Sequence, residues 1–208
     1  MASKEPPLVH QYKITLRDIS PAIWRRIQVP KSHTFWDLHV AIQDSMGWLD
    51  YHLHAFRFAA VAGNRPIEIG IPEGALDHSV LPGWKVRIAD YFTPPGVVAQ
   101  YEYDFGDGWE HDVALEDVLP SEAKRKYPRC IAGDRACPPE DCGGVPGYEH
   151  LVEVLRRSNH PEYGEFVDWL KGHAKNYHPF DPARFEVHAV RFSDSKKRWA
   201  RAFAGGYR

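Results

Sequence analysis

The strongest constraint on the fold is an alternation of apolar and polar residues near the N-terminus. In residues 10–18 every second side chain is apolar, at Tyr12, Ile14 and Leu16. A period of two is typical of a half-buried strand. A turn with a proline at position 21 follows, and residues 22–30 place Ile23, Ile27 and Val29 on one face. The two segments predict an antiparallel hairpin.

Residues 35–46 carry the clearest helix pattern in the chain. Apolar side chains recur there at steps of three and four residues, at Phe35, Leu38, Ile42 and Met46. This spacing produces one apolar stripe along a helix. Thr34 and Asp37 have the spacing of a capping box, and Gly47 is placed to end the helix.

A second hairpin is predicted over residues 101–115. Aromatic residues alternate with carboxylates before Gly106-Asp107-Gly108, and the alternation resumes after it. The two glycines suit a tight turn. The same alternation predicts that His111 faces inward with Trp109, and that Asp104 faces the other way with Glu102.

A further strand at residues 51–60 and two short helices, at residues 147–157 and 160–172, complete the expected elements. Residues 121–147 read as a long loop rich in Pro, Gly and Cys. This order predicts a single α+β domain with a mostly antiparallel sheet and helices packed on one side.

The bulk composition is that of a soluble globular protein, with 43% hydrophobic and 26% charged residues among 208. A net charge of −2 argues against a protein whose whole surface binds nucleic acid. Seven basic residues face two acidic ones after position 183, so nucleic-acid contact there stays an alternative to a solvated helix face. No apolar stretch reaches membrane-spanning length and no secretory segment is recognisable, so a cytoplasmic protein without membrane contact is expected.

The cysteines form a C-x6-C-x4-C array. An odd number of cysteines argues against a disulfide framework. Three thiolates and one histidine would complete a tetrahedral zinc site, and a bound metal would hold the long loop in shape. Its predicted ligands are Cys130, Cys137, Cys142 and His111. The alternative is three reduced, partly buried thiols.

Histidines and carboxylates supply a second set of candidate ligands. His52 and His54 are two residues apart and would share one face of a strand, as a chelating pair or packed against aromatic neighbours. Catalytic or divalent-cation roles are predicted for His54, Asp104, Asp107, Glu140 and Asp141. Capping of backbone amides in turns is the alternative for the aspartates.

Several familiar motifs are excluded. Asp104-Phe105-Gly106 lacks the other elements of a kinase, and the nearby carboxylates miss the spacing of an EF-hand loop. The chain also has no nucleophile elbow, no Walker A motif, no dinucleotide fingerprint and no H-E-x-x-H pair.

Three segments together resemble one family. They read H-L-H-x-F from His52, Y-D-F-G-D-x-W-x-H from Tyr103, and P-P-E-D-x-G-G-x-x-G-Y from Pro138. With the N-terminal hairpin and FDPARFEV near the end, the chain is similar to plasmid pRiA-type ORF-3-like proteins, also described as transposon-passenger, TnpR-like proteins. The resemblance implies one α+β domain over residues 10–192, with a flexible N-terminal segment at 1–9 and a basic tail at 193–208. It implies no established activity.

Two functions of different classes remain open on the sequence, and whether the protein is an enzyme is undecided. The first is a binding module in a mobile-element setting, stabilised by zinc in the cysteine loop and acting on a protein or nucleic-acid partner. The second is a metal-dependent hydrolase, of the nuclease or phosphoesterase type, with histidine and carboxylate ligands.

Overall fold

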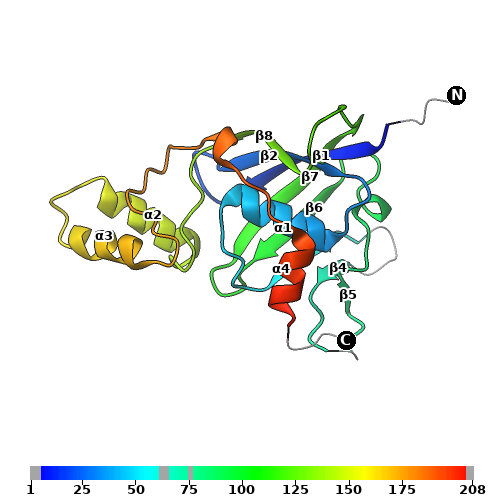
Figure 1. Ribbon diagram of the computed structural model, residues 1–208. Coiled ribbons are helices and arrows are strands. Elements are labelled where there is room, and N and C mark those ends of the chain that lie inside the picture. The colour runs from blue at the N-terminus through cyan, green and yellow to red at the C-terminus, as the bar shows by residue number, and fades with distance from the viewer. Residues whose placement is uncertain (1–5, 61–65, 75–76, 205–208) are drawn as a thin grey trace, which may run out of the picture.

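The computed structural model of the protein describes residues 6–60, 66–74 and 77–204 (Figure 1). Its centre is one eight-stranded sheet with the order β5-β4-β3-β6-β7-β1-β2-β8. Neighbouring strands are antiparallel except β4 and β5, which are parallel. The strands are β1 (Leu8–Leu16), β2 (Trp24–Pro30), β3 (His54–Phe58), β4 (Ile67–Gly70), β5 (Val80–Pro82), β6 (Val98–Tyr103), β7 (Trp109–Pro120) and β8 (Arg129–Asp134). The prediction of a single, mostly antiparallel α+β domain is confirmed.

Both predicted hairpins form. β1 pairs with β2 so that Tyr12 lies opposite Ile27, and β6 pairs with β7 so that Tyr101 lies opposite His111. Most apolar side chains of these strands are buried because they lie on the face that turns toward the core. β8 lies inside residues 121–147, where a loop was predicted, so that prediction was wrong for this stretch. Its mixture of polar and small residues carries no alternation, and pairing with β2 at the sheet edge makes it a strand.

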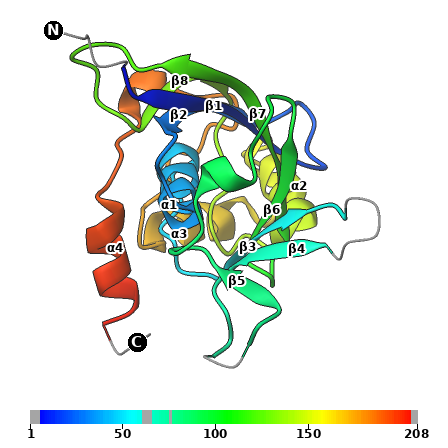
Figure 2. The same ribbon diagram turned by 90° about the vertical axis from the view of Figure 1, so that its right-hand side faces the viewer.

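The helix α1 (Phe35–Met46) has the predicted ends. The Thr34 side chain accepts a hydrogen bond from the Asp37 amide, Asp37 accepts one from the Thr34 amide, and Gly47 ends the helix in the left-handed region at φ 91°. Figure 2 shows the sheet curling around α1. Ten of its residues are buried, far more than one apolar stripe supplies, because α1 is covered on two sides.

The second element that covers α1 is the C-terminal segment. After a 3-10 turn at Val187–Ala189, the short helix α4 (Ser195–Ala202) packs on the side of α1 away from the sheet (Figure 2). Arg198 donates to Asp44 at 2.6 Å, and the indole of Trp36 donates to the carbonyl of Ser195 at 3.0 Å. The basic tail is therefore, as far as the structure describes it, a docked helix.

The remaining helices, α2 (Gly144–Leu155) and α3 (Tyr163–Gly172), pack against each other beyond one end of the sheet (Figure 1). A second 3-10 turn, Ile88–Asp90, precedes β6. β1 begins at Leu8, so Leu8 and Val9 of the expected N-terminal segment lie in the sheet, while residues 1–5 lie outside the described residues. None of the described helices is long and apolar enough to cross a membrane.

Candidate metal site

The turn between β6 and β7 begins with a change of backbone direction at Asp104. Asp104 adopts a left-handed conformation at φ 58°, which aspartate tolerates better than most residues. Its Oδ1 accepts hydrogen bonds from the amides of Gly106 at 3.0 Å and Asp107 at 3.3 Å. Its own amide donates to the carbonyl of Leu53 at 2.9 Å, which holds the chain before β3 beside the turn. One carboxylate oxygen of Asp104 is thus used by the turn, and Oδ2 is left for another partner.

Glu140 attaches the loop before α2 to the same region. Its side chain is 1% exposed. The hydroxyl of Tyr103 donates to Oε1 at 2.5 Å, and the amide of Leu49 donates to Oε2 at 2.8 Å. The indole of Trp48 also donates to the carbonyl of Pro138 at 2.9 Å. A buried carboxylate needs such partners, and these fix the loop on β6 and on the segment after α1.

Gly144 allows the loop to approach the turn closely, and Gly147 allows the loop to fold back on itself. A Cβ added at Gly144, which has φ 67°, would lie 2.5 Å from the carbonyl oxygen of Asp107. A Cβ at Gly147 would lie 1.9 Å from the carbonyl oxygen of Cys142. Asp107 strengthens this junction because its Oδ2 accepts a hydrogen bond from the amide of Gly143 at 3.2 Å. Asp107 therefore caps backbone, as the structural alternative predicted.

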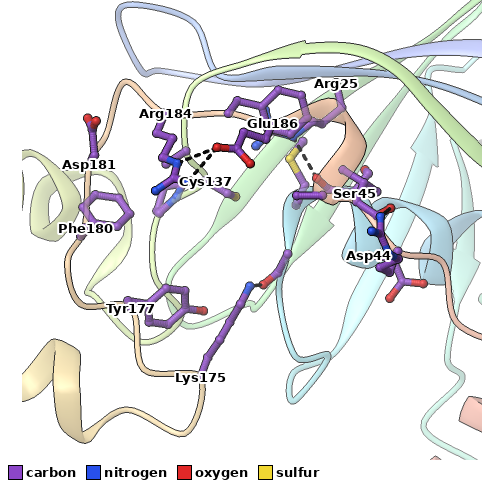
Figure 3. Close-up of a pocket in the computed structure, with 18 of the residues that line it drawn as sticks. Arg25, Asp44, Ser45, Cys137, Lys175, Tyr177, Phe180, Asp181, Arg184 and Glu186 are labelled. Carbon is purple, nitrogen blue, oxygen red and sulfur yellow. Dashed lines mark hydrogen bonds and ion pairs between the residues drawn. The ribbon is translucent and has the colours of Figure 1, made fainter.

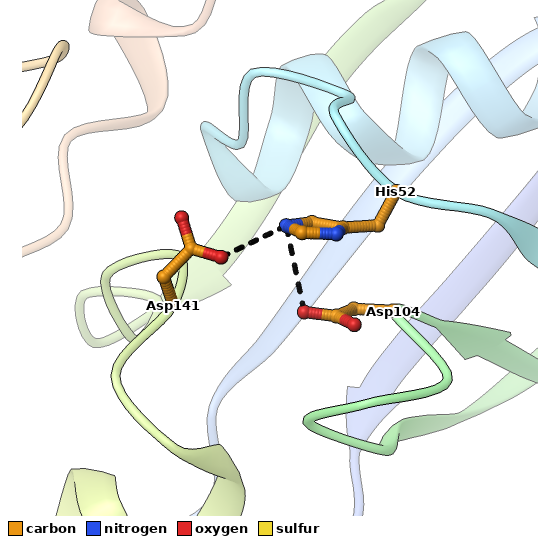
Figure 4. Close-up of side chains that lie close together, drawn as sticks. All are labelled: His52, Asp104 and Asp141. Carbon is orange, nitrogen blue, oxygen red and sulfur yellow. Dashed lines mark hydrogen bonds and ion pairs between the residues drawn. The ribbon is translucent and has the colours of Figure 1, made fainter.

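These contacts bring His52, Asp104 and Asp141 together (Figure 4). The Nε2 atom of His52 lies 3.0 Å from Oδ1 of Asp141 and 3.5 Å from Oδ2 of Asp104. One ligand atom from each residue lies within 4.8 Å of the other two. Asp141, like Asp104, is held in the left-handed region, at φ 59°. An imidazole nitrogen and two carboxylate oxygens around one point form a donor set for a divalent cation.

His173, which follows α3, contacts the same group from outside. Its Nε2 lies 3.8 Å from Oδ2 of Asp141, while its Nδ1 accepts a hydrogen bond from the amide of Lys175 at 3.2 Å. Because Nδ1 is the acceptor, the ring hydrogen lies on Nε2 and is directed at Asp141. His173 is therefore suited to orient the carboxylate rather than to bind a metal itself.

The cluster lies at the surface, with the side chains of Asp104, His52 and Asp141 exposed by 11%, 30% and 52%. Three exposed apolar side chains are next to it in sequence: Tyr51, Leu53 and Phe105. A pocket of about 220 Å³ adjoins Asp141 and is lined also by Cys142, Glu165, Phe166 and Trp169. A polar cluster with an apolar border is typical of a binding site.

His54 does not belong to this group, and the prediction that it shares a face with His52 was wrong. His52 lies before β3 begins, so strand alternation does not relate the two side chains. His54 is buried and stacks on His39 of α1, with ring centroids 3.4 Å apart. It faces the core, whereas His52 faces the surface cluster.

His111 faces inward with Trp109, as predicted. It is fully buried against Trp48 and Tyr101, and its Nδ1 lies 3.0 Å from the carbonyl oxygen of Trp109. Burial lowers the pKa of His111 to about 4. Within the described part of the chain His111 is not part of a cluster of ligand atoms, so its position is that of a core histidine.

The three cysteines are reduced and lie on different parts of the fold. Cys130 lies on β8, Cys137 is buried at the start of the loop, and Cys142 lies before α2. Burial raises the pKa of Cys137 to about 12 and, as a direction, the pKa of Cys130 and Cys142. Among the described residues these thiols and His111 do not form a metal-binding group. Cys130 is paired into the sheet on β8, whereas Cys137 and Cys142 lie in the loop that follows.

Comparison with known proteins places the chain in a family. The model of plasmid pRiA4b ORF-3-like proteins matches residues 8–189. The chain belongs to this family. The uncharacterized protein y4hQ of Sinorhizobium fredii is 29% identical over 194 residues, covering 93% of this chain and 95% of that protein. The crystal structure of MM3350, a protein of unknown function from Methanosarcina mazei Go1, is 44% identical, with a TM-score of 0.79 over 89% of this chain and 99% of that one.

The family segments named above meet at the cluster. The H-L-H-x-F segment supplies His52, the Y-D-F-G-D segment supplies Asp104, and the P-P-E-D segment supplies Asp141. His173 was not predicted, because no motif surrounds it and its role depends on a contact made across the fold. In this member of the pRiA4b ORF-3-like family, the cluster is thus assembled from three loops that are far apart in sequence.

Proposed function

We propose that the protein is a binding module whose interaction site is built on one divalent metal ion held by His52, Asp104 and Asp141. The observation that carries the proposal is the convergence of these three side chains, with Nε2 of His52 within 3.5 Å of both carboxylates. A cation would lie between these three groups. Imidazole with carboxylates suits Zn²⁺, Mn²⁺ or Fe²⁺ better than Ca²⁺ or Mg²⁺.

The local structure supports a site that is formed before the metal binds. Asp104 is fixed through its other oxygen by two turn amides, and Asp141 is faced by Nε2 of His173. Ligands held in this way lose little freedom on binding. Three protein ligands leave coordination positions open for an oxygen donor from a partner.

A protein partner fits the border of the site better than a nucleic acid. Tyr51, Leu53 and Phe105 are exposed by 61%, 53% and 48%, and large exposed side chains of this kind are typical of protein contacts. The turn at residues 104–108 contains Asp104 and Asp107 and no lysine or arginine, and Asp141 adds a third carboxylate beside it. That charge repels a phosphate backbone.

Calorimetric titration of metal-free protein with Zn²⁺ and Mn²⁺ tests the proposal. We expect about one equivalent to bind, and Asp141→Asn to weaken binding by more than about 10-fold, since even outer ligands contribute that much. Asp168→Asn on α3 is the matched control, because that carboxylate is 82% exposed. Failure of the wild-type protein to bind either metal, or equal binding by Asp141→Asn, would overturn the proposal.

The zinc site predicted in the cysteine loop is tested by the same titration. A Cys130→Ser, Cys142→Ser double variant keeps all three ligands of the His52 cluster. If the double variant loses the metal while Asp141→Asn retains it, the cysteines and not the cluster hold the ion.

Metal-dependent hydrolysis is a second candidate function, favoured by the 220 Å³ pocket beside Asp141. A metal with open positions lowers the pKa of bound water and so supplies a nucleophile next to that pocket. The test is turnover of p-nitrophenyl phosphate and its diester by the metal-loaded protein. Turnover lost on chelation and in Asp141→Asn would support a phosphoesterase, and no turnover with a fully loaded site would leave the binding module as the function.

A further inference from the structure

A second pocket is lined in part by the segment that carries Cys137 and Pro138. It has a volume of about 390 Å³, within the range of small-molecule sites. Figure 3 shows Lys175 and Tyr177 at its lower edge, Arg184 and Glu186 at its upper edge, and Arg25 beyond Cys137. It shares no lining residue with the His52 cluster. Four cationic side chains and three carboxylates line it.

Arg25 is the unusual member of this lining. Its side chain is buried, 1% exposed, yet among the described residues its hydrogen-bond partners are neutral carbonyls. These are the carbonyls of Trp24, Ser45, Asp134 and Arg135. They use four of the five guanidinium N–H groups. Phe185 stacks on the guanidinium, 3.7 Å from its ring centroid. A buried cation that no carboxylate of the described residues contacts favours an anion in the pocket.

Lys175 adds a second cation with a neutral partner. Its ammonium donates to the carbonyl of Gly47, and no carboxylate of the described residues forms an ion pair with it. Desolvation lowers the pKa of Lys175, and the carboxylate of Glu140, which acts on its charge, accepts its hydrogen bonds from Tyr103 and Leu49. Next to it, the hydroxyl of Tyr177 accepts a hydrogen bond from the Glu140 amide at 3.3 Å. Its own hydrogen is therefore available to an acceptor.

The carboxylates of the lining are directed to other groups. Asp44 binds Arg198 at 2.6 Å, Glu186 binds Arg184 at 2.7 Å, and Asp181 accepts from the amide of Ala183 at 2.9 Å. The thiol of Cys137 is not the missing anion either, because burial raises its pKa to about 12 and keeps it neutral. Among the described residues, no carboxylate thus forms an ion pair with Arg25 or Lys175, although Asp134 and Glu140 act on their charges from a longer distance.

We propose that this pocket binds a small organic anion, with its charged oxygens between Arg25 and Lys175. The remaining N–H of Arg25, the ammonium of Lys175 and the hydroxyl of Tyr177 are its donors. Apolar side chains that include Phe180 and Met46 receive the body of the ligand. A carboxylate and a phosphate ester share this chemistry. The proposal is independent of the metal at the His52 cluster.

Titration of the full chain with benzoate, phenyl phosphate and benzyl alcohol, followed by calorimetry and by amide chemical shifts, tests the pocket. We expect at least one anion to bind with a Kd on the order of 1 mM or tighter, and neutral benzyl alcohol to bind at least about tenfold more weakly. Binding of benzoate alone would assign a carboxylate ligand, and binding of phenyl phosphate alone a phosphate ester.

Variants at Lys175 make the test specific. Lys175→Met should weaken binding of the anion by about tenfold, and Lys175→Arg should retain that binding. Lys171→Met is the matched control, an exposed lysine on α3 that should bind as the wild type does. The proposal is overturned if neither anion binds at a ligand concentration of about 10 mM, ten times the expected Kd, or if benzyl alcohol binds as tightly as the anions. It is also overturned if Lys175→Met binds the anion like the control variant while its thermal midpoint shows an intact fold.

Discussion

The rings of His39 and His54 stack in the core with their centroids 3.4 Å apart and their planes 8° apart. His39 also contacts the hydroxyl of Tyr101 at 2.9 Å and Asp50 at 2.7 Å. Burial and the charge of His39 lower the pKa of His54 well below its usual value. One ring of the stack is thus tied to a carboxylate, and the other is kept neutral.

This stack makes stability sensitive to acid. The unfolded chain protonates His54 below pH 6.5, whereas the folded chain does not, so stability is complete above pH 6.5 and falls as the pH drops below it. Each such histidine contributes a slope of about 1.4 kcal/mol per pH unit. His10 and His111, each with its pKa lowered to about 4, add to the loss between pH 6.5 and 4.

Replacement of His54 by phenylalanine tests this origin of the acid sensitivity. The ring fits among Trp36, Phe56 and Tyr101 and cannot be protonated. Between pH 8 and pH 5 the variant should lose about 2 kcal/mol less unfolding free energy than the wild type. Urea denaturation at both pH values measures the difference, and equal losses in the two proteins would contradict the prediction.

Substitutions of Asp104 should separate the contribution of its turn contacts to stability from its contribution to metal binding. In Asp104→Asn the amide oxygen can accept from Gly106 and Asp107, and asparagine tolerates the positive φ, so stability should stay within about 0.5 kcal/mol. Asp104→Ala should cost about 2 kcal/mol, from the lost cap and the strained backbone.

Metal titration of the same two variants completes the comparison. Both should bind Zn²⁺ more than about 10-fold more weakly than the wild type, because both lack the carboxylate oxygen that faces His52. If Asp104→Asn bound the metal as the wild type does, Asp104 would be a turn residue alone.

Tyr103 and Glu140 link stability to the geometry of the site. Tyr103→Phe leaves Oε1 of Glu140 buried without its donor, and the expected cost is about 2 kcal/mol. A Tyr103→Phe, Glu140→Gln double variant should recover part of that loss, because the unpaired charge is removed. Since Asp141 follows Glu140, the single variant should also weaken metal binding by about 10-fold. Chemical denaturation and calorimetry measure the two effects, and strictly additive losses in the double variant would contradict this coupling.

Arg198 should carry much of the docking of α4. It contacts Asp44 at 2.6 Å and Asp50 at 3.4 Å, and it is 19% exposed. Arg198→Met leaves both carboxylates with one partner fewer, and we expect a cost of about 2 kcal/mol. Lys197→Met, an exposed neighbour on the same helix, should change stability by less than about 0.5 kcal/mol. Fluorescence of Trp199, which packs on Trp36, reports undocking, and equal effects of the two variants would show that the ion pairs contribute little.

Local patterns in the sequence were enough for most of the sheet and for α1. The alternation at Tyr12, Ile14 and Leu16 and the capping box at Thr34 act within a few residues. The strand and the start of the helix can therefore be predicted from neighbouring side chains. The inward direction of His111 followed for the same reason. β8 did not follow, because an edge strand without alternation forms through its pairing with β2.

The candidate site shows where local reasoning ends. The sequence identified Asp104 and Asp141 as candidate ligands, but it placed His54 with them, whereas in the structure His52, which lies before β3, takes that position. The loop of Asp141 reaches Asp104 through the buried Glu140 and through Gly144, which admits the Asp107 carbonyl. Such contacts join residues far apart in the chain, and sequence spacing carries no record of them. By itself the sequence determined the two hairpins, the first helix and the chemical types of the ligands. The tertiary structure decided which of those ligands meet, because their meeting depends on packing between loops.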